Sequence, residues 1–158
     1  ACTCGFRVRA RDRLGNVGEY PPAPQAQTTV VLYPIATMVP FNPNIINSTS
    51  PVTTSFTLRW TGNTPPGTTI TQYQIHYRMV DLNGTVLQPW TVWQTFNGTV
   101  NQATFPIALG NGLYQFEATA TNDKGQTTPF AGRVEATMIV DLNDTIKPML
   151  FMPVASNR

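Results

Sequence analysis

The chain has 158 residues, of which 41% are hydrophobic and only 11% are charged. The hydrophobic share is enough for a buried core, whereas the charged share is well below the usual quarter. A formal net charge of +2 argues against nucleic-acid binding. No apolar run reaches the roughly 20 residues of a membrane-spanning helix, so we expect no membrane insertion. No signal peptide begins the chain, so a secretion signal would belong to a longer precursor.

The first strand-like stretch is GFRVRARDRLGN, residues 5–16. Its alternation of apolar and polar residues predicts a strand with two different faces. Phe6 and Val8 would turn toward a partner surface, and the opposite face would be cationic. That opposite face consists of Arg7, Arg9, Arg11 and Arg13. It is either a stripe that binds a polyanion, such as an acidic polysaccharide, or the solvated face of an ordinary strand.

The same stretch recurs later in the chain. FRVRARDRLGN is followed 110 residues later by FEATATNDKGQ, so that Phe6 matches Phe116 and Gly15 matches Gly125. Similarity at a fixed offset indicates a repeated structural unit, of which the chain would contain one copy only in part. The second copy has no arginine at the positions of the four arginines, so the fold does not require a cationic face.

Short strands separated by turns are predicted for the rest of the chain. The strand-like segments are SFTLRW, QYQIHYRM, WTVWQTF, ATFPIAL, LYQFEATATND and GRVEATMIV. Asn83 and Gly84 predict a two-residue hairpin turn, because both residue types tolerate a positive φ. No window shows a sustained helical period, so almost no helix is expected. This pattern favours an antiparallel β-sandwich.

Three of these segments resemble a fibronectin type III domain over roughly residues 36–142. They are the strand ending at Trp60, the Y-x-I-x-Y strand that begins at Tyr73, and the Y-x-F-x-A-x-A-x-N-D-x-G strand with its hairpin. The resemblance implies an all-β, antiparallel Greek-key sandwich with Trp60 on its second strand. It also implies that Leu109 and Tyr114 form the family's tyrosine corner. Residues 4–32 resemble only the last two strands, F and G, of such a domain.

We therefore expect three parts. Residues 1–32 form an F–G-like hairpin of a preceding or partner-completed domain, residues 33–142 form a complete type III-like domain, and residues 143–158 form a linker and a tail strand. A two-stranded hairpin alone is marginally stable in water. The surface that covers Phe6 and Val8 would then come from neighbouring subunits that lend strands, or from adjacent domains of the same protein.

No catalytic constellation is recognisable in the sequence. The chain has one histidine, His76, which the alternation places on the exposed face of its strand beside Arg78. No nucleophile elbow, carboxylate pair of glycosidase type or phosphate-binding loop accompanies it. We expect a non-enzymatic protein without a cofactor.

Metal binding has one weak candidate. The pair Cys2 and Cys4 lacks the second pair of ligands that a zinc site needs. Asp141, Asn143 and Asp144 offer hard oxygen ligands of the kind that calcium prefers. They resemble the calcium-binding linker between cadherin repeats, and the alternative is a plain polar linker.

Surface features supply the remaining candidates. Trp90 and Trp93 are three residues apart, so in a regular strand they face opposite sides, one toward the core and one exposed, unless a bulge intervenes. An exposed tryptophan could anchor a partner. Four asparagines match the N-glycosylation pattern and are glycosylation candidates: Asn47, Asn83, Asn97 and Asn143.

The ending KPMLFMPVASNR resembles the short endings of large secreted bacterial repeat proteins. We accordingly expect residue 158 to be the natural C-terminus and the protein to lie outside the cell or on its surface. The leading hypothesis is a structural or adhesive module of a bacterial surface protein or filament. It would assemble through strand pairing and end-to-end domain packing. The alternative is a carbohydrate-binding accessory module of a secreted enzyme.

Overall fold

The computed structural model describes residues 2–50 and 54–143, and it divides the chain into two compact units. We call Ala1–Tyr33 the N-terminal unit and Pro34–Arg158 the sandwich unit. The described residues contain ten strands and no helix, in agreement with the predicted all-β class. None of these residues belongs to a helix that is long and apolar enough to cross a membrane.

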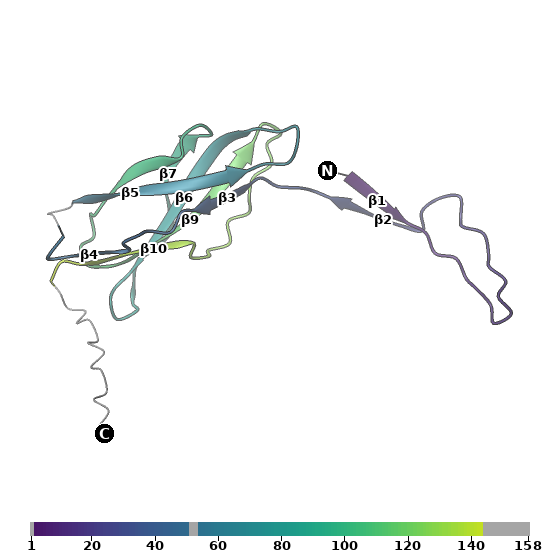
Figure 1. Cartoon of the computed structure of the whole chain (residues 1–158), viewed down its shortest axis with the longest axis horizontal. Helices are drawn as coiled ribbons and strands as arrows, with labels where there is room; N and C mark the ends of the chain where they lie inside the picture. The colour runs from purple at the N-terminus through teal and green to yellow at the C-terminus, as the bar shows by residue number, and fades with distance from the viewer. Residues whose placement is uncertain (1, 51–53, 144–158) are drawn as a thin grey trace, which may run out of the picture. The chain divides into compact units, whose positions relative to one another are not determined.

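Two sheets form the sandwich unit (Figure 1). The five-stranded sheet has the order β4 (Ile45–Asn47), β10 (Ala136–Asp141), β9 (Gly112–Asn122), β6 (Ile70–Val80) and β7 (Val86–Asn97). The three-stranded sheet has the order β3 (Ile35–Met38), β5 (Ser55–Asn63) and β8 (Gln102–Pro106). All neighbouring strands are antiparallel except β4 and β10, which are parallel.

The core lies between the two sheets and is rich in aromatic residues. Alternate residues of β5 are buried, as the sequence pattern predicts: Phe56, Leu58 and Trp60. The Phe56 ring lies 5.4 Å from that of Phe105 and 5.9 Å from that of Phe116, measured between centroids. Burial of such large apolar side chains is the main favourable contribution to folding. This burial explains how a unit built from short strands with few charged residues is stable.

Of two predicted local features, the tyrosine corner is confirmed, whereas the two-residue turn is wrong. The Tyr114 hydroxyl donates to the Gly110 carbonyl at 2.9 Å and accepts from the Leu109 N–H at 3.2 Å, which is the expected tyrosine corner. The turn between β6 and β7 has three residues, Leu82–Gly84, because the Asp81 N–H donates to the Thr85 carbonyl at 2.8 Å. Gly84 has a φ of 95°. A positive φ at this position suits glycine because it has no Cβ.

The N-terminal unit is a hairpin of β1 (Cys2–Phe6) and β2 (Ala26–Val30), and it repeats the pairing of β9 and β10. Every pair in the hairpin has a counterpart 110 residues later. The outermost pairs of the hairpin are Cys2 with Val30 and Phe6 with Ala26. Their counterparts in the sandwich unit are Gly112 with Val140 and Phe116 with Ala136. The connections between the paired strands match too. An isolated β-bridge joins Arg11 to Val17 in the first connection and Thr121 to Thr127 in the second. The repeat predicted from the sequence is therefore present in the backbone register.

The strand predicted from residue 6 onward is shorter and earlier than expected. It ends at Phe6, and residues 7–13 lie outside any strand. In the sandwich unit, β9 continues to Asn122 because β6 pairs along its other edge. No strand among the described residues borders β1 in this way within the N-terminal unit. Phe6 and Val8 are 55% and 71% exposed, and no described residue of this unit is buried.

The last strand is also shorter than predicted. The segment GRVEATMIV was expected to be a strand throughout, but β10 begins only at Ala136. Residues 128–135, which we call the covering segment, cross the outer face of the five-stranded sheet instead. The Glu117 carboxylate on β9 accepts hydrogen bonds from the N–H groups of Ala131 and Arg133. These bonds give the covering segment partners outside the strand ladder.

Candidate interaction sites

An open strand edge lies where the chain passes from one sheet to the other. After Met38 the chain leaves the three-stranded sheet and continues to β4, which pairs with β10. The last contact of this stretch with β5 is the hydrogen bond from the Val39 N–H to the Arg59 carbonyl, 2.8 Å long. The first part of β5, before Arg59, therefore pairs with β8 alone among the described strands.

Thr57 presents its backbone to this open edge. Backbone groups of successive residues in an antiparallel strand point to alternate sides. Since the Arg59 carbonyl points toward the departing chain, the N–H and C=O of Thr57 point the same way. No hydrogen bond from another described residue reaches either group. Unpaired groups of this kind can pair with an added strand.

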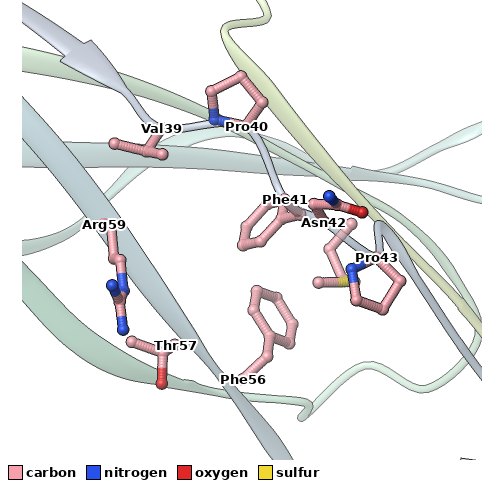
Figure 2. A pocket seen from close by; sticks show the side chains of 9 residues that line it. Val39, Pro40, Phe41, Asn42, Pro43, Phe56, Thr57 and Arg59 are labelled. Carbon is pink, nitrogen blue, oxygen red and sulfur yellow. The ribbon is translucent and has the colours of Figure 1, made fainter.

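A pocket of about 410 Å³ lies beside the open edge (Figure 2). Its apolar wall consists of Pro40, Phe41, Pro43, Phe56 and Met138. The rings of Phe41 and Phe56 meet edge to face, with centroids 5.5 Å apart. Arg59 is the only charged residue that lines it, and this guanidinium has no ion pair within the described part of the chain. No sequence pattern marks this site, because it results from the departure of the chain after β3.

A second site lies on the outer face of the five-stranded sheet. The Arg78 guanidinium lies over the Trp90 ring at 5.2 Å, and its Nε donates to Gln115 Oε1 at 2.6 Å. Phe130 of the covering segment lies 5.7 Å from Trp90 and stacks on His76 at 4.3 Å, between ring centroids. We call Arg78, Trp90 and Phe130 the outer cluster. A cation over an indole is a favourable arrangement that orders both side chains.

His76 is buried, so the predicted exposed position is wrong. Its side chain is only 7% exposed because the covering segment lies on it, and its Nε2 is 3.3 Å from Thr119 Oγ1. Burial lowers the pKa of His76 from its ordinary value, because it disfavours the imidazolium, and the charge of Glu117 partly opposes this effect. A neutral histidine under Phe130 has a packing role.

Glu117 was not recognised in the sequence as a candidate residue. The alternation correctly places it on the outer face of β9, yet it is only 3% exposed. Its carboxylate accepts from the Ala131 N–H at 2.8 Å and from the Arg133 N–H at 2.5 Å. The long connection after β9, which contains Phe130, was the available signal that this face is covered.

The two tryptophans lie on opposite sides of β7, and the strand carries a bulge at Trp93, which was the alternative to a regular strand. Trp93 packs toward the core, with its ring 5.0 Å from Phe105 and 5.6 Å from Phe96. The register between β6 and β7 shifts beside it, between Ile75 and His76. Trp90 belongs to the outer cluster and is half-buried. A partner-binding role for either tryptophan stays a prediction.

The arginine stripe has no strand to support it. Arg7, Arg9, Arg11 and Arg13 are all exposed. The Arg9 guanidinium lies 4.7 Å from the centre of the Tyr20 ring, which is the clearest contact of the group. Binding of a polyanion by these residues stays a prediction, as does binding of a partner by Phe6 and Val8.

The calcium and glycan candidates are distributed as follows. Asp141 is buried at the end of β10, Asn143 is exposed, and Asp144 lies outside the described residues. No group of three or more histidine, cysteine, aspartate or glutamate side chains that could hold a metal ion occurs among the residues that the structure describes. Asn83 and Asn97 are exposed, whereas Asn47 is half-buried. The Asn47 side chain accepts a hydrogen bond from Thr49 Oγ1 at 2.8 Å, and that of Asn97 accepts one from Thr99 Oγ1 at 3.2 Å. Calcium binding and glycosylation stay predictions.

The sheet order, the tyrosine corner and the buried Trp60 define a β-sandwich module of the immunoglobulin-like class. The fibronectin type III domain family matches residues 40–137, more than half of the chain, and the chain therefore belongs to this family. The predicted resemblance is confirmed. No curated protein and no solved structure gives a significant match. Members of this family serve as structural and binding modules.

Proposed function

We propose that this protein is a non-enzymatic structural module of an extracellular bacterial surface protein or filament. It assembles through strand pairing of its N-terminal unit and end-to-end packing of type III domains. Neighbouring subunits or adjacent domains of the same protein are the partners.

One observation carries this proposal. The hairpin of β1 and β2 has the register of β9 and β10 at an offset of 110 residues, which supports its interpretation as the F–G hairpin of a second type III unit. In the sandwich unit, the counterpart of Phe6 is Phe116, which is fully buried against strands of the opposite sheet. Phe6 is exposed because the described part of the N-terminal unit supplies no such strands. Pairing with strands from elsewhere would bury it.

Sedimentation velocity of the full chain over a range of concentrations tests the proposal. We expect association that weakens when Phe6 is replaced by alanine, because Phe6 would enter the completed core. Leu14→Ala is the matched control, since Leu14 lies in the connection of the hairpin and is 88% exposed. A monomer at every concentration would contradict pairing between subunits.

A carbohydrate-binding accessory module is the second candidate function, and the outer cluster supports it. Trp90 and Phe130 present aromatic surface beside the polar groups of Arg78 and Gln115. A glycan array should then give binding that Trp90→Ala abolishes. Trp93→Phe is the control on the core side of the strand. An array without a hit would remove this candidate.

A further inference from the structure

We propose that the open edge of β5 is a binding site for an extended acidic peptide segment of a partner protein. The peptide adds a strand beside Thr57, places an apolar side chain in the neighbouring pocket and sets a carboxylate against Arg59. The site lies wholly in the sandwich unit, so it goes beyond the proposed assembly and does not depend on the N-terminal hairpin.

The backbone supplies the first part of the recognition. Thr57 offers an N–H and a C=O to the open side, and Ser55, two residues earlier, offers the same pair by alternation. An extended chain running along this edge can therefore continue the three-stranded sheet where β3 leaves it. Addition of a strand to an exposed sheet edge is a general mode of peptide recognition, in which backbone bonds give affinity and pockets give specificity.

The pocket supplies the second part. Phe56 follows Ser55 and precedes Thr57, so its side chain points inward while theirs point away from the core. A residue of the added strand that lies opposite Phe56 likewise points inward, into the apolar wall formed with Phe41 and Met138. Figure 2 shows the space between the Phe41 and Phe56 rings and the Arg59 side chain. Val39–Pro43 border this space.

Charge selects the kind of peptide. Among the described residues of the pocket lining, Arg59 is the only charged one; it is exposed, and it has no ion pair with a described residue. The Arg59 side chain is on the same outward face of β5 as that of Thr57. It would therefore contact the outward-pointing side chains of the added strand, which alternate with the side chain that points into the pocket. A carboxylate next to the apolar anchor therefore complements the site, and a lysine in that place is repelled.

Fluorescence anisotropy with the full chain and a fluorescein-labelled peptide, Thr-Val-Phe-Glu-Val-Thr, tests the proposal. We expect saturable binding that becomes roughly tenfold weaker when lysine replaces the glutamate of the peptide, or when the chain carries Arg59→Glu. The charge-swapped pair, Arg59→Glu with the lysine peptide, should recover the affinity. Lys124→Glu, at an exposed turn outside the pocket lining, is the matched charge control and should leave binding unchanged.

A backbone variant tests strand addition separately. Thr57→Pro removes the outward N–H but no bond to β8, whereas Thr57→Val keeps the N–H. We expect only the proline variant to weaken binding, by roughly tenfold. Absence of binding at millimolar peptide, or binding indifferent to the charge swap, would overturn the proposal. So would self-association of the chain that Thr57→Pro abolishes, which would make a second copy the occupant. If the proline variant does not fold, the charge swap decides.

Discussion

At the scale of single residues, polar side chains fix loops to the strands of the sandwich unit. Tyr114 holds the turn before β9, Glu117 holds the covering segment, and Trp60 donates through Nε1 to the Val100 carbonyl at 3.0 Å. No buried side-chain nitrogen or oxygen among the described residues lacks a hydrogen-bond partner. Because an unsatisfied buried polar atom costs about 1–3 kcal/mol, removing one partner should be measurable.

Tyr114→Phe should lower the free energy of unfolding by about 1–2 kcal/mol, because it removes two hydrogen bonds without creating a cavity. Urea denaturation followed by tryptophan fluorescence measures the change. Tyr77→Phe is the matched control, since no hydrogen bond of its hydroxyl to another described residue is found, and it should change stability less. Equal losses in the two variants would contradict a role for the tyrosine corner.

His76 should make stability depend on pH. Its pKa in the folded protein lies below the ordinary value of 6.5, because burial disfavours the charged form. The unfolded chain therefore takes up the proton first, so stability is full above about pH 6.5 and declines as the pH falls toward the folded-state pKa. Urea denaturation at pH 7.5 and at pH 5.5 should show a smaller decline for His76→Gln than for the unchanged chain. The same decline in both proteins would contradict this account.

At the scale of elements, the covering segment distinguishes this domain from a sandwich with a bare outer sheet face. Phe130 stacks on β6, and Glu117 of β9 binds the backbone at Ala131 and Arg133. The N–H groups of Thr128 and Glu135 at its two ends donate to the Ala120 and Phe116 carbonyls of β9, and between these ends the segment depends on side-chain contacts rather than on a strand ladder. Elements attached in this way open locally at lower free energy than core strands.

Glu117→Gln should loosen the covering segment without unfolding the sandwich. The amide can keep one acceptor, but its NH₂ group faces the second backbone N–H, so we expect a loss of about 1–3 kcal/mol in local stability. Hydrogen exchange should become faster at Ala131 and Arg133, while the amides of β10 from Met138 onward stay protected as an internal control. Unchanged exchange at both positions would contradict the anchoring role of Glu117.

The sequence predicted the central strands of the sandwich unit because they show local alternation of apolar and polar residues. Phe56, Leu58 and Trp60 alternate with polar residues, and burial follows that pattern. The same pattern could not show that His76 is covered, because coverage depends on a segment more than 50 residues away in the chain. Nor could it show the open edge at Thr57, which results from the departure of β3 to the other sheet.

At the scale of the whole molecule, the two units differ in what holds them together. The sandwich unit has a continuous core, whereas no described residue of the N-terminal unit is buried. Such a hairpin contributes little to cooperative unfolding. The free energy of unfolding of the sandwich unit should accordingly be independent of the hairpin.

Removal of residues 1–33 should leave the thermal midpoint of the sandwich unit unchanged within about 2 °C, at concentrations where the full chain is monomeric. Circular dichroism of the two chains measures this. A lower midpoint in the shortened chain would show that the hairpin stabilises its own sandwich unit, in disagreement with the separation of the two units.

Residue-resolved hydrogen exchange of the N-terminal hairpin, as a function of chain concentration, tests the assembly proposal most directly. By the alternation of backbone groups, the N–H groups of Thr3 and Gly5 point away from β2, since the Phe6 carbonyl accepts from the Gln25 N–H on the β2 side. We predict that these two amides exchange rapidly in dilute solution and become protected as subunits pair. Rapid exchange at every concentration, or protection already present in the dilute monomer, would contradict assembly through strand pairing between subunits.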